Sequence, residues 1–355
     1  MKTKLSILIT ALLFTYQVSA QNVITVDNSV GSNAQYNNLQ SAISAANSGD
    51  IIYIHASEIN YGNINVDKPL TLIGFSHSDA DKKTMINNIV LLQDASNTTI
   101  SGINITNDFI VDNTNPISNL VIENNLFIGP LSGRDIIFST GGADNVLFRG
   151  NVVRGAGFGI NTSSTNFNIL TNVIISNNVF IATDIIVRYH QSTTIKNNIF
   201  LSSSNVIAPV RNLNDDSGDV TVQNCIIYAS WSGGGGVVDA NSDGVSYNNC
   251  MSFNESGSVV NLIGANNLNN QNPLFENLES SNNFNAELDN HHLQAGSPAI
   301  GTGAAGVDMG IYDGSAFTFN NFGYTNGIPT VKITNITDRI APGANLNVTI
   351  NTNAN

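Results

Sequence analysis

Charged side chains are scarce in this 355-residue chain, since only 11% of its residues are Asp, Glu, Lys or Arg. The 26 acidic residues outnumber the 13 basic ones, so the formal net charge at pH 7 is −13. A surface of this sign repels nucleic acid and anionic membranes, and neither is expected as a partner. No apolar run reaches the ~20 residues that a membrane-spanning helix needs, so no membrane span is expected.

The first twenty residues have the features of an export signal. Lys2 and Lys4 precede an apolar run at residues 5–14, and Val18-Ser19-Ala20 is a small-residue cleavage site. We therefore expect residues 1–20 to be a signal peptide, and the mature protein to be secreted, periplasmic or on the cell surface.

Asparagine, in contrast, is abundant, with 57 residues, and many of them fall in a repeated phrase. The phrase reads VIENNLFI, LFRGNVV, VIISNNVFI, TIKNNIFL, VQNCIIY and SYNNCMSF in chain order. Aligned on the second turn residue, the copies fall 26, 27, 20, 27 and 25 residues apart, at Asn125, Asn151, Asn178, Asn198, Cys225 and Cys250. A period of this length predicts a solenoid.

The columns of this alignment alternate between apolar and polar residues. Two columns are apolar in every copy, so both are expected to face a common interior; one contains Ile122, Phe148 and Ile175, and the other contains Leu126 and Val152. A polar column runs between them: Glu123, Arg149, Ser176, Lys196, Gln223 and Asn248. Alternation on both sides of a two-residue Asn- or Gly-containing break predicts strand, turn, strand, with stacked asparagines at the parallel-strand spacing of ~4.8 Å.

A third strand per coil is expected between the repeats, at 136–138, 158–160, 185–187, 206–208, 237–238 and 259–260. Three strands in about 25 residues predict an all-β fold, the right-handed parallel β-helix. Asn38 is placed to cap a short helix that covers the open N-terminal end of this rod. We expect the β-helix domain to span 21–315, and 316–355 to form a C-terminal tail, either a hairpin or the first two strands of an immunoglobulin-like module.

The only two cysteines, Cys225 and Cys250, fall at the same position of adjacent copies. Stacked coils would bring their Cα atoms within disulfide reach, and export makes oxidation possible. Two buried thiols that replace asparagine in the turn explain the same pattern. Both alternatives remain open at the level of sequence.

Two phrases resemble known proteins. LQSAISAANSGDIIYI at 39–54 is similar to the helix-then-strand cap of pectin-lyase-like β-helix proteins. The closing phrase at 272–314, which contains HHLQAGSPAIGTGAAGVDMGIYDG, is similar to the end of many secreted β-helix proteins of polysaccharide-degrading bacteria. The resemblance covers roughly 22–314 and implies a carbohydrate partner, a monomer, and a substrate face along the third strand and the loops that follow it.

IIVRYHQSTTIKNNIFL at 185–201 resembles the arginine-bearing coil of chondroitinase-B-like polysaccharide lyases. In such enzymes a cation neutralises a uronic acid carboxylate while a base and an acid move protons. The resemblance implies a role for Arg188 alone. Tyr189 and His190 follow it in the chain and can serve as base and acid, so all three residues are catalytic candidates. Those lyases carry a lysine about one coil earlier, whereas residues 159–172 contain none.

Substrate-binding candidates lie in the same middle region of the rod: Asn161, Arg154 and Arg211. Asp215, Asp216 and Asp219 follow closely, and clustered carboxylates are ligands for calcium, although a polar turn has the same composition. Two functions fit these residues. One is a lyase that cleaves an acidic polysaccharide by β-elimination, and the other is a non-catalytic β-helix that binds glycan or acts as an adhesin.

Overall fold

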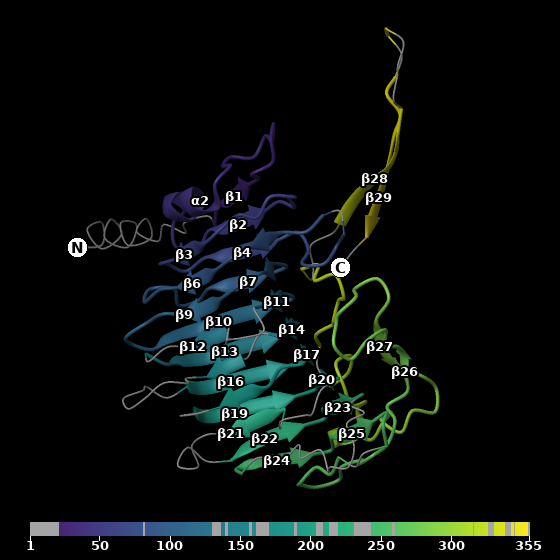
Figure 1. Cartoon of the computed structure of the whole chain (residues 1–355). Helices are drawn as coiled ribbons and strands as arrows, with labels where there is room; N and C mark the ends of the chain where they lie inside the picture. Colours follow the sequence, from purple (N-terminus) through teal and green to yellow (C-terminus); the bar gives the residue numbers. More distant parts are fainter. Residues whose placement is uncertain are drawn as a thin grey trace, which may run out of the picture.

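Three parallel sheets run along the molecule, and each full coil contributes one strand to each of them (Figure 1). The computed structural model describes residues 21–80, 82–129, 136–138, 141–155, 158–160, 170–187, 190–203, 209–212, 219–230, 243–257, 260–314, 316–325, 330–337, 342–343 and 345–353. Within these residues the chain is a right-handed parallel β-helix, as the sequence predicts. The coil visits the sheets in the order that we call sheet 1, sheet 2 and sheet 3.

Sheet 1 has ten strands: β1 Val23–Val26, β2 Ile51–Ile54, β4 Thr71–Gly74, β7 Thr99–Ser101, β10 Ile117–Glu123, β13 Ala143–Arg149, β16 Leu170–Ser176, β19 His190–Lys196, β22 Val220–Gln223 and β24 Val245–Asn248. Sheet 2 has eight strands: β5 Met85–Ile86, β8 Asn104–Ile105, β11 Leu126–Ile128, β14 Val152–Arg154, β17 Val179–Ile181, β20 Ile199–Ser202, β23 Ile226–Ala229 and β25 Met251–Asn254. Sheet 3 has seven: β3 Ile64–Val66, β6 Ile89–Leu91, β9 Phe109–Val111, β12 Ile136–Phe138, β15 Phe158–Ile160, β18 Ile185–Val187 and β21 Val210–Asn212.

The register of sheet 1 matches the columns read from the sequence. Ile122 pairs with Phe148 and Phe148 with Ile175, and these side chains are buried. The polar column pairs in the same way, from Glu123 through Arg149 onward to Asn248. The two-residue break between sheets 1 and 2 is therefore one turn repeated in successive coils.

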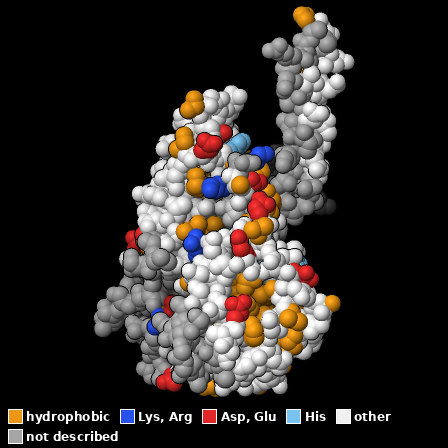
Figure 2. Space-filling view, turned by 45° about the vertical axis from the view of Figure 1, so that its right-hand side comes forward, with side chains coloured by type: hydrophobic (Ala, Val, Ile, Leu, Met, Phe, Trp, Pro, Cys, Tyr) orange, Lys and Arg blue, Asp and Glu red, His pale blue; other side chains and the backbone are white. Residues whose placement is uncertain are grey.

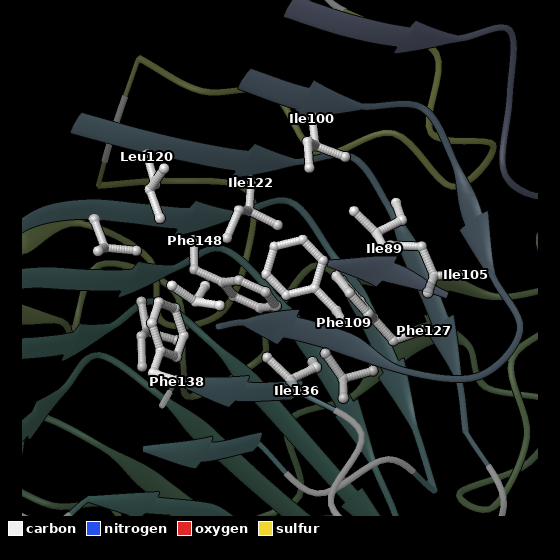
Figure 3. Packing of buried hydrophobic residues seen from close by; sticks show 14 of the residues in the cluster. Ile89, Ile100, Ile105, Phe109, Leu120, Ile122, Phe127, Ile136, Phe138 and Phe148 are labelled. Carbon is white, nitrogen blue, oxygen red and sulfur yellow. The ribbon is translucent and has the colours of Figure 1, made fainter. Parts of the chain in front are cut away.

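The interior is a continuous apolar core with aromatic side chains near the middle of the rod (Figure 3). Phe127 packs edge-on against Phe109, with ring centroids 6.0 Å apart, and lies 5.6 Å from Phe148. The helix α2, Leu39–Ala45, closes the N-terminal end by burying Leu39 and Ile43. Its N-cap is Asn38, whose side chain accepts a hydrogen bond from the Ser41 backbone, as predicted.

The predicted asparagine stack is present. Asn125, Asn151, Asn178 and Asn198 are buried neighbours, and the Nδ2 of each of the first three donates to the Oδ1 of the next asparagine at 3.0–3.2 Å. Cys225 and Cys250 continue the stack as two free, buried thiols. The Sγ of Cys225 accepts from the Asn198 backbone N–H at 3.3 Å, and the Sγ of Cys250 accepts from that of Cys225 at 3.4 Å. The thiols thus take over the acceptor role of the asparagine oxygen.

The sheet 3 strand that pairs with β18 in this coil is β21, in which Val210 pairs with Ile185 and Asn212 with Val187. Residues 206–208, where the sequence predicts the third strand, lie outside the described residues. Val210 and Asn212 are buried, while Arg211 between them points outward and contacts Asp184. The buried Val210 and Asn212, together with the outward ion pair of Arg211, thus fix the register of β21 against β18. Val260 lies outside any strand, and residues 237–238 lie outside the described residues.

The chain returns along the rod after the last coil (Figure 1). It first forms the antiparallel pair β26 Phe275–Asn277 and β27 Asn290–Leu293. The next segment, which we call the strap (299–314 and 316–325), follows the turn between sheets 1 and 2. The strap contains the 3₁₀ turn η2 Ala304–Gly306. Turn asparagines of three coils hold it: Asn249 donates to Thr302 O, Asn197 to Gly310 O and Asn177 to Ile311 O.

The strap and Phe275 of β26 bury the outer face of sheet 2. Met309, Ile311, Phe317 and Phe319 of the strap, together with Phe275, form a second apolar cluster with the outward residues of sheet 2. Leu126 and Val152 belong to this cluster, so the prediction that their column shares an interior with the Ile122 column is wrong; the strap covers that column instead. Beyond the strap, β28 Thr330–Ile336 and β29 Val348–Asn353 form an antiparallel hairpin that extends away from the rod (Figure 1). Among the described residues, none of the helices is long and apolar enough to cross a membrane.

Candidate functional site

The outer face of sheet 3 is where the sequence predicts substrate contacts. Each strand of this sheet has three residues, so its middle side chain points outward. The half-buried middle residues Val90, Ile110 and Ile137 stack in register, and further along the same face Ile186 pairs with Arg211. The face is thus mostly aliphatic, with an arginine near its C-terminal end.

Arg211 is held by an ion pair across two coils. Its Nε donates to Oδ2 of Asp184 at 2.6 Å, and a terminal guanidinium nitrogen contacts the same oxygen. The Arg211 side chain is 30% exposed and that of Asp184 is 18% exposed. Asp184 compensates the charge and fixes the direction of the guanidinium, which leaves other N–H groups of the fork for a ligand.

Asp184 is a site residue that the sequence analysis missed. It lies two residues before Ile186, the partner of Arg211 in the register, so the alignment of β18 with β21 would have revealed it. The sequence pattern pointed to a strand at 206–208 and not at 210–212, so this relationship was not visible from the sequence. Arg211 lies at the middle of β21.

The catalytic candidates border this face in the chain. Val187, which precedes Arg188, pairs with Asn212, the neighbour of Arg211. His190 is the first residue of β19 in sheet 1, where it pairs with Leu170, so it is not part of a sheet 3 strand. Arg188 and Tyr189 lie outside the described residues, as do Asn161, Asp215 and Asp216.

Arg154 is not part of the same face. It ends β14 in sheet 2, between Ile128 and Ile181 of the adjacent strands. Its coil is two coils away from that of Arg211. The structure therefore does not bring these two predicted substrate-binding residues together.

The predicted calcium ligands are represented by Asp219 alone, which is exposed just before β22. Among the described residues, no three His, Cys, Asp or Glu side chains are grouped as metal ligands would be. A calcium site at Asp215, Asp216 and Asp219 stays a prediction.

Arg149 has the role that its column predicts. Its Nε and a terminal guanidinium nitrogen contact Oε2 of Glu123 in the adjacent coil, at 2.8 and 2.7 Å. The guanidinium carbon also lies 4.8 Å from the centre of the Phe317 ring, so the strap covers this pair. Arg149 therefore fastens the strap to sheet 1 and lies away from sheet 3.

Comparison with known proteins places this chain in no family. No family model and no curated protein matches the sequence. Among solved structures, the chain is similar to pectate lyase Pel9A, at 15% identity over 87% of this chain and 98% of that chain, with a TM-score of 0.35. It is also similar to the pectin methylesterase from Aspergillus niger in its deglycosylated form, at 14% identity over 70% and 86% of the two chains, with a TM-score of 0.25. The assignment of the fold rests on the strand order of this chain itself, which is that of a parallel β-helix.

Proposed function

We propose that this protein binds a carboxylated polysaccharide at the C-terminal end of the sheet 3 face and cleaves it by β-elimination. The observation that carries the proposal is the pairing of Val187 with Asn212. It aligns the end of β18, after which Arg188 and Tyr189 follow in the chain, with the strand that holds Arg211. Two arginines from successive coils are a suitable arrangement for a sugar carboxylate, which accepts bidentate hydrogen bonds.

The reaction assigns a role to each candidate. Arg188 and Arg211 neutralise the uronate carboxylate, which lowers the pKa of the adjacent carbon acid. One of Tyr189 and His190 removes the proton from that carbon, and the electron pair forms a carbon–carbon double bond. The glycosidic C–O bond then breaks, and the leaving oxygen takes a proton from the other residue. The products are a new reducing end and an unsaturated uronate.

The ion pair of Arg211 with Asp184 supports a second candidate function, glycan binding without cleavage. A guanidinium whose charge is already compensated stabilises a developing dianion less than a free one does. It still donates hydrogen bonds to hydroxyl or carboxylate oxygens of a bound sugar. The leader-like residues 1–20 support export to the cell exterior for either function.

The test is incubation of the purified protein with a panel of uronate-containing glycans while the absorbance of the unsaturated product is followed. We expect Arg188→Ala to lower the rate by on the order of 10²–10³ and Arg211→Ala to lower it by less. Lys196→Ala is the matched control, since it removes one positive charge from sheet 1 and should leave the rate unchanged.

The outcomes separate the two candidates. Product formation that depends on Arg188 supports the lyase. Retention of a glycan that weakens in Arg188→Ala and Arg211→Ala, with no unsaturated ends in any variant, supports binding alone. If both variants match the wild type in retention and turnover, the sheet 3 assignment is wrong.

A further inference from the structure

Three aromatic side chains meet where the strap ends near the N-terminal coils. Tyr324 stacks on Phe322, with ring centroids 5.7 Å apart and an interplanar angle of 26°, and meets Phe75 edge-on at 5.8 Å. Phe75 belongs to the loop that follows β4, so residues almost 250 positions apart in the sequence form one cluster. All three side chains are partly exposed. We call Phe75, Phe322 and Tyr324 the aromatic platform.

The backbone beneath the platform is firmly held. The carbonyl oxygen of Phe322 accepts from Ser76 Oγ at 2.6 Å and from the His77 backbone N–H at 3.0 Å. Gly323 has a φ of +70°, and a Cβ there would lie 1.9 Å from His77 Cδ2, so only glycine fits. The rings of Phe322 and Tyr324, two residues apart, consequently point to the same side. A preorganised platform binds without the entropy cost of ordering its own side chains.

Polar groups of both signs surround the platform. The Tyr324 hydroxyl donates to Asp79 Oδ2 at 2.6 Å, and burial together with this carboxylate raises the pKa of Tyr324, so the phenol keeps its proton. The Nζ of Lys82 lies 5.9 Å from the centre of the Phe75 ring. Lys82 is exposed, the structure records no ion pair for it among the described residues, and Lys83 follows it in the chain. Figure 2 shows basic, acidic and apolar side chains close together on the upper part of the face that carries the strap.

Partly exposed rings next to a lysine, a carboxylate and a hydroxyl match the surface of an acidic sugar. A pyranose ring has an apolar face of C–H groups that packs on an aromatic ring, and its edge carries hydroxyl and carboxylate oxygens. Lys82 and Lys83 can pair with the carboxylate, and Asp79 can accept from a hydroxyl. A purely structural fastening of the strap would need the rings but would not need a lysine over them.

We propose that the aromatic platform, with Asp79, Lys82 and Lys83, is a second binding site for a carboxylated glycan. The proposal rests on the proposed function for its ligand class and adds a site outside sheet 3. The loop after β4 precedes the coil of Arg211 by five coil steps, which is roughly 24 Å along the rod axis at ~4.8 Å per coil. The two sites therefore have no residues in common and can be removed separately.

The test is titration of the full chain with a galacturonate hexasaccharide and with the same hexasaccharide after reduction of its carboxylates. We expect Lys82→Ala and Phe75→Ala each to weaken the binding of the charged probe about tenfold. The Lys82→Ala effect should shrink in high salt and be absent with the reduced probe, because it is electrostatic. Lys196→Ala should bind like the wild type.

Phe75 also packs against the strap, so the thermal stability of Phe75→Ala is measured alongside its affinity. Lys82 is exposed, and Lys82→Ala should leave the fold intact. Wild-type affinity in Lys82→Ala, or no binding of the charged probe by the wild type, overturns the second site. Loss of binding in Lys82→Ala with unchanged turnover and retention in Arg188→Ala and Arg211→Ala would support the second site and contradict the sheet 3 assignment. Normal binding in Lys82→Ala with lost turnover in Arg188→Ala would contradict the second site and support the sheet 3 assignment.

Discussion

Asn178 accepts two hydrogen bonds from Asn151 in the preceding coil through a single side-chain oxygen, from the backbone N–H at 2.8 Å and from Nδ2 at 3.1 Å. Its own Nδ2 donates to Phe148 O at 3.1 Å and to Asn198 Oδ1 at 3.0 Å. One buried side chain thus satisfies backbone groups of the turn and joins three coils. An unpaired backbone group at this depth would be costly, which explains why asparagine recurs at the position.

Asn178→Ala should therefore be strongly destabilising. It leaves the Asn151 backbone N–H and one hydrogen of Asn151 Nδ2 without an acceptor and removes the Asn178 donor from the Phe148 carbonyl. We therefore expect a loss of about 2–4 kcal/mol in the free energy of unfolding. Asn107→Ala is the control, since the half-buried Asn107 side chain bonds Asn88 and lies outside the stack, and it should cost less than about 1 kcal/mol. Equal losses in urea denaturation of the two variants would show that the stack has no special role.

Adjacent residues of β16 test which face of sheet 1 is interior. Ile175 is fully buried, whereas Ile174 is 38% exposed. Ile175→Asp places an unpaired carboxylate in the core and should prevent folding, while Ile174→Asp should fold and melt close to the wild type. Circular dichroism and thermal melting of the pair decide this. Folded Ile175→Asp, or unfolded Ile174→Asp, would contradict the register.

The coils could be predicted because their signal repeats along the chain. Ile122, Phe148 and Ile175 form one buried row, and six copies of the phrase make their alternation unmistakable. The strap could not be predicted, because its contacts with the coils join residues 53 or more positions apart and each occurs once. Gly150 is an example. It replaces asparagine in the turn because a Cβ there would lie 2.1 Å from the Phe317 ring of the strap, and the sequence does not reveal that contact.

Two strap glycines separate the effect of space from the effect of backbone strain. Gly323 and Gly306 both have positive φ, +70° and +78°, but only Gly323 lies against the rod, since nothing is within 4 Å of a Cβ at Gly306. Gly306→Ala should cost about 1 kcal/mol through strain alone. Gly323→Ala should cost more, because it forces the strap away from His77, and limited proteolysis should then release the C-terminal segment faster. Similar proteolysis rates for both variants would contradict the close contact.

His77 makes the attachment of the strap sensitive to acid. Its side chain is fully buried against Gly323 and Phe284, and burial lowers its pKa from 6.5 to about 3. Because the folded-state pKa of His77 is below its unfolded value, protonation favours the unfolded chain. The free energy of unfolding is therefore highest above pH 6.5 and falls as the pH falls toward 3. At about pH 5 the free energy of unfolding should be lower by about 2 kcal/mol.

His77→Gln should therefore flatten the acid side of the stability curve, measured by urea denaturation between about pH 7 and pH 4.5. His55→Gln is the control, because the His55 side chain is 51% exposed. An unchanged acid slope in His77→Gln would show that His77 does not control this transition.

The site was less predictable than the coils. Arg211 was found because a basic residue is conspicuous in an acidic chain, but its partner Asp184 required the correct register of β21. The aromatic platform gave no signal in the sequence, since Phe75 and Tyr324 are isolated aromatics that only the path of the strap brings together. Sequence patterns report periodic burial, whereas ligand contacts here depend on single pairings between distant segments.

The most direct test of the account is to compare the wild type, Arg188→Ala, Arg211→Ala and Lys196→Ala on one uronate-containing glycan, with retention and the unsaturated product measured in the same samples. The account predicts that the wild type and Lys196→Ala retain the glycan and form the product alike. It predicts a rate lower by on the order of 10²–10³ in Arg188→Ala and a smaller loss in Arg211→Ala. Retention and turnover that are identical in all four proteins would contradict it.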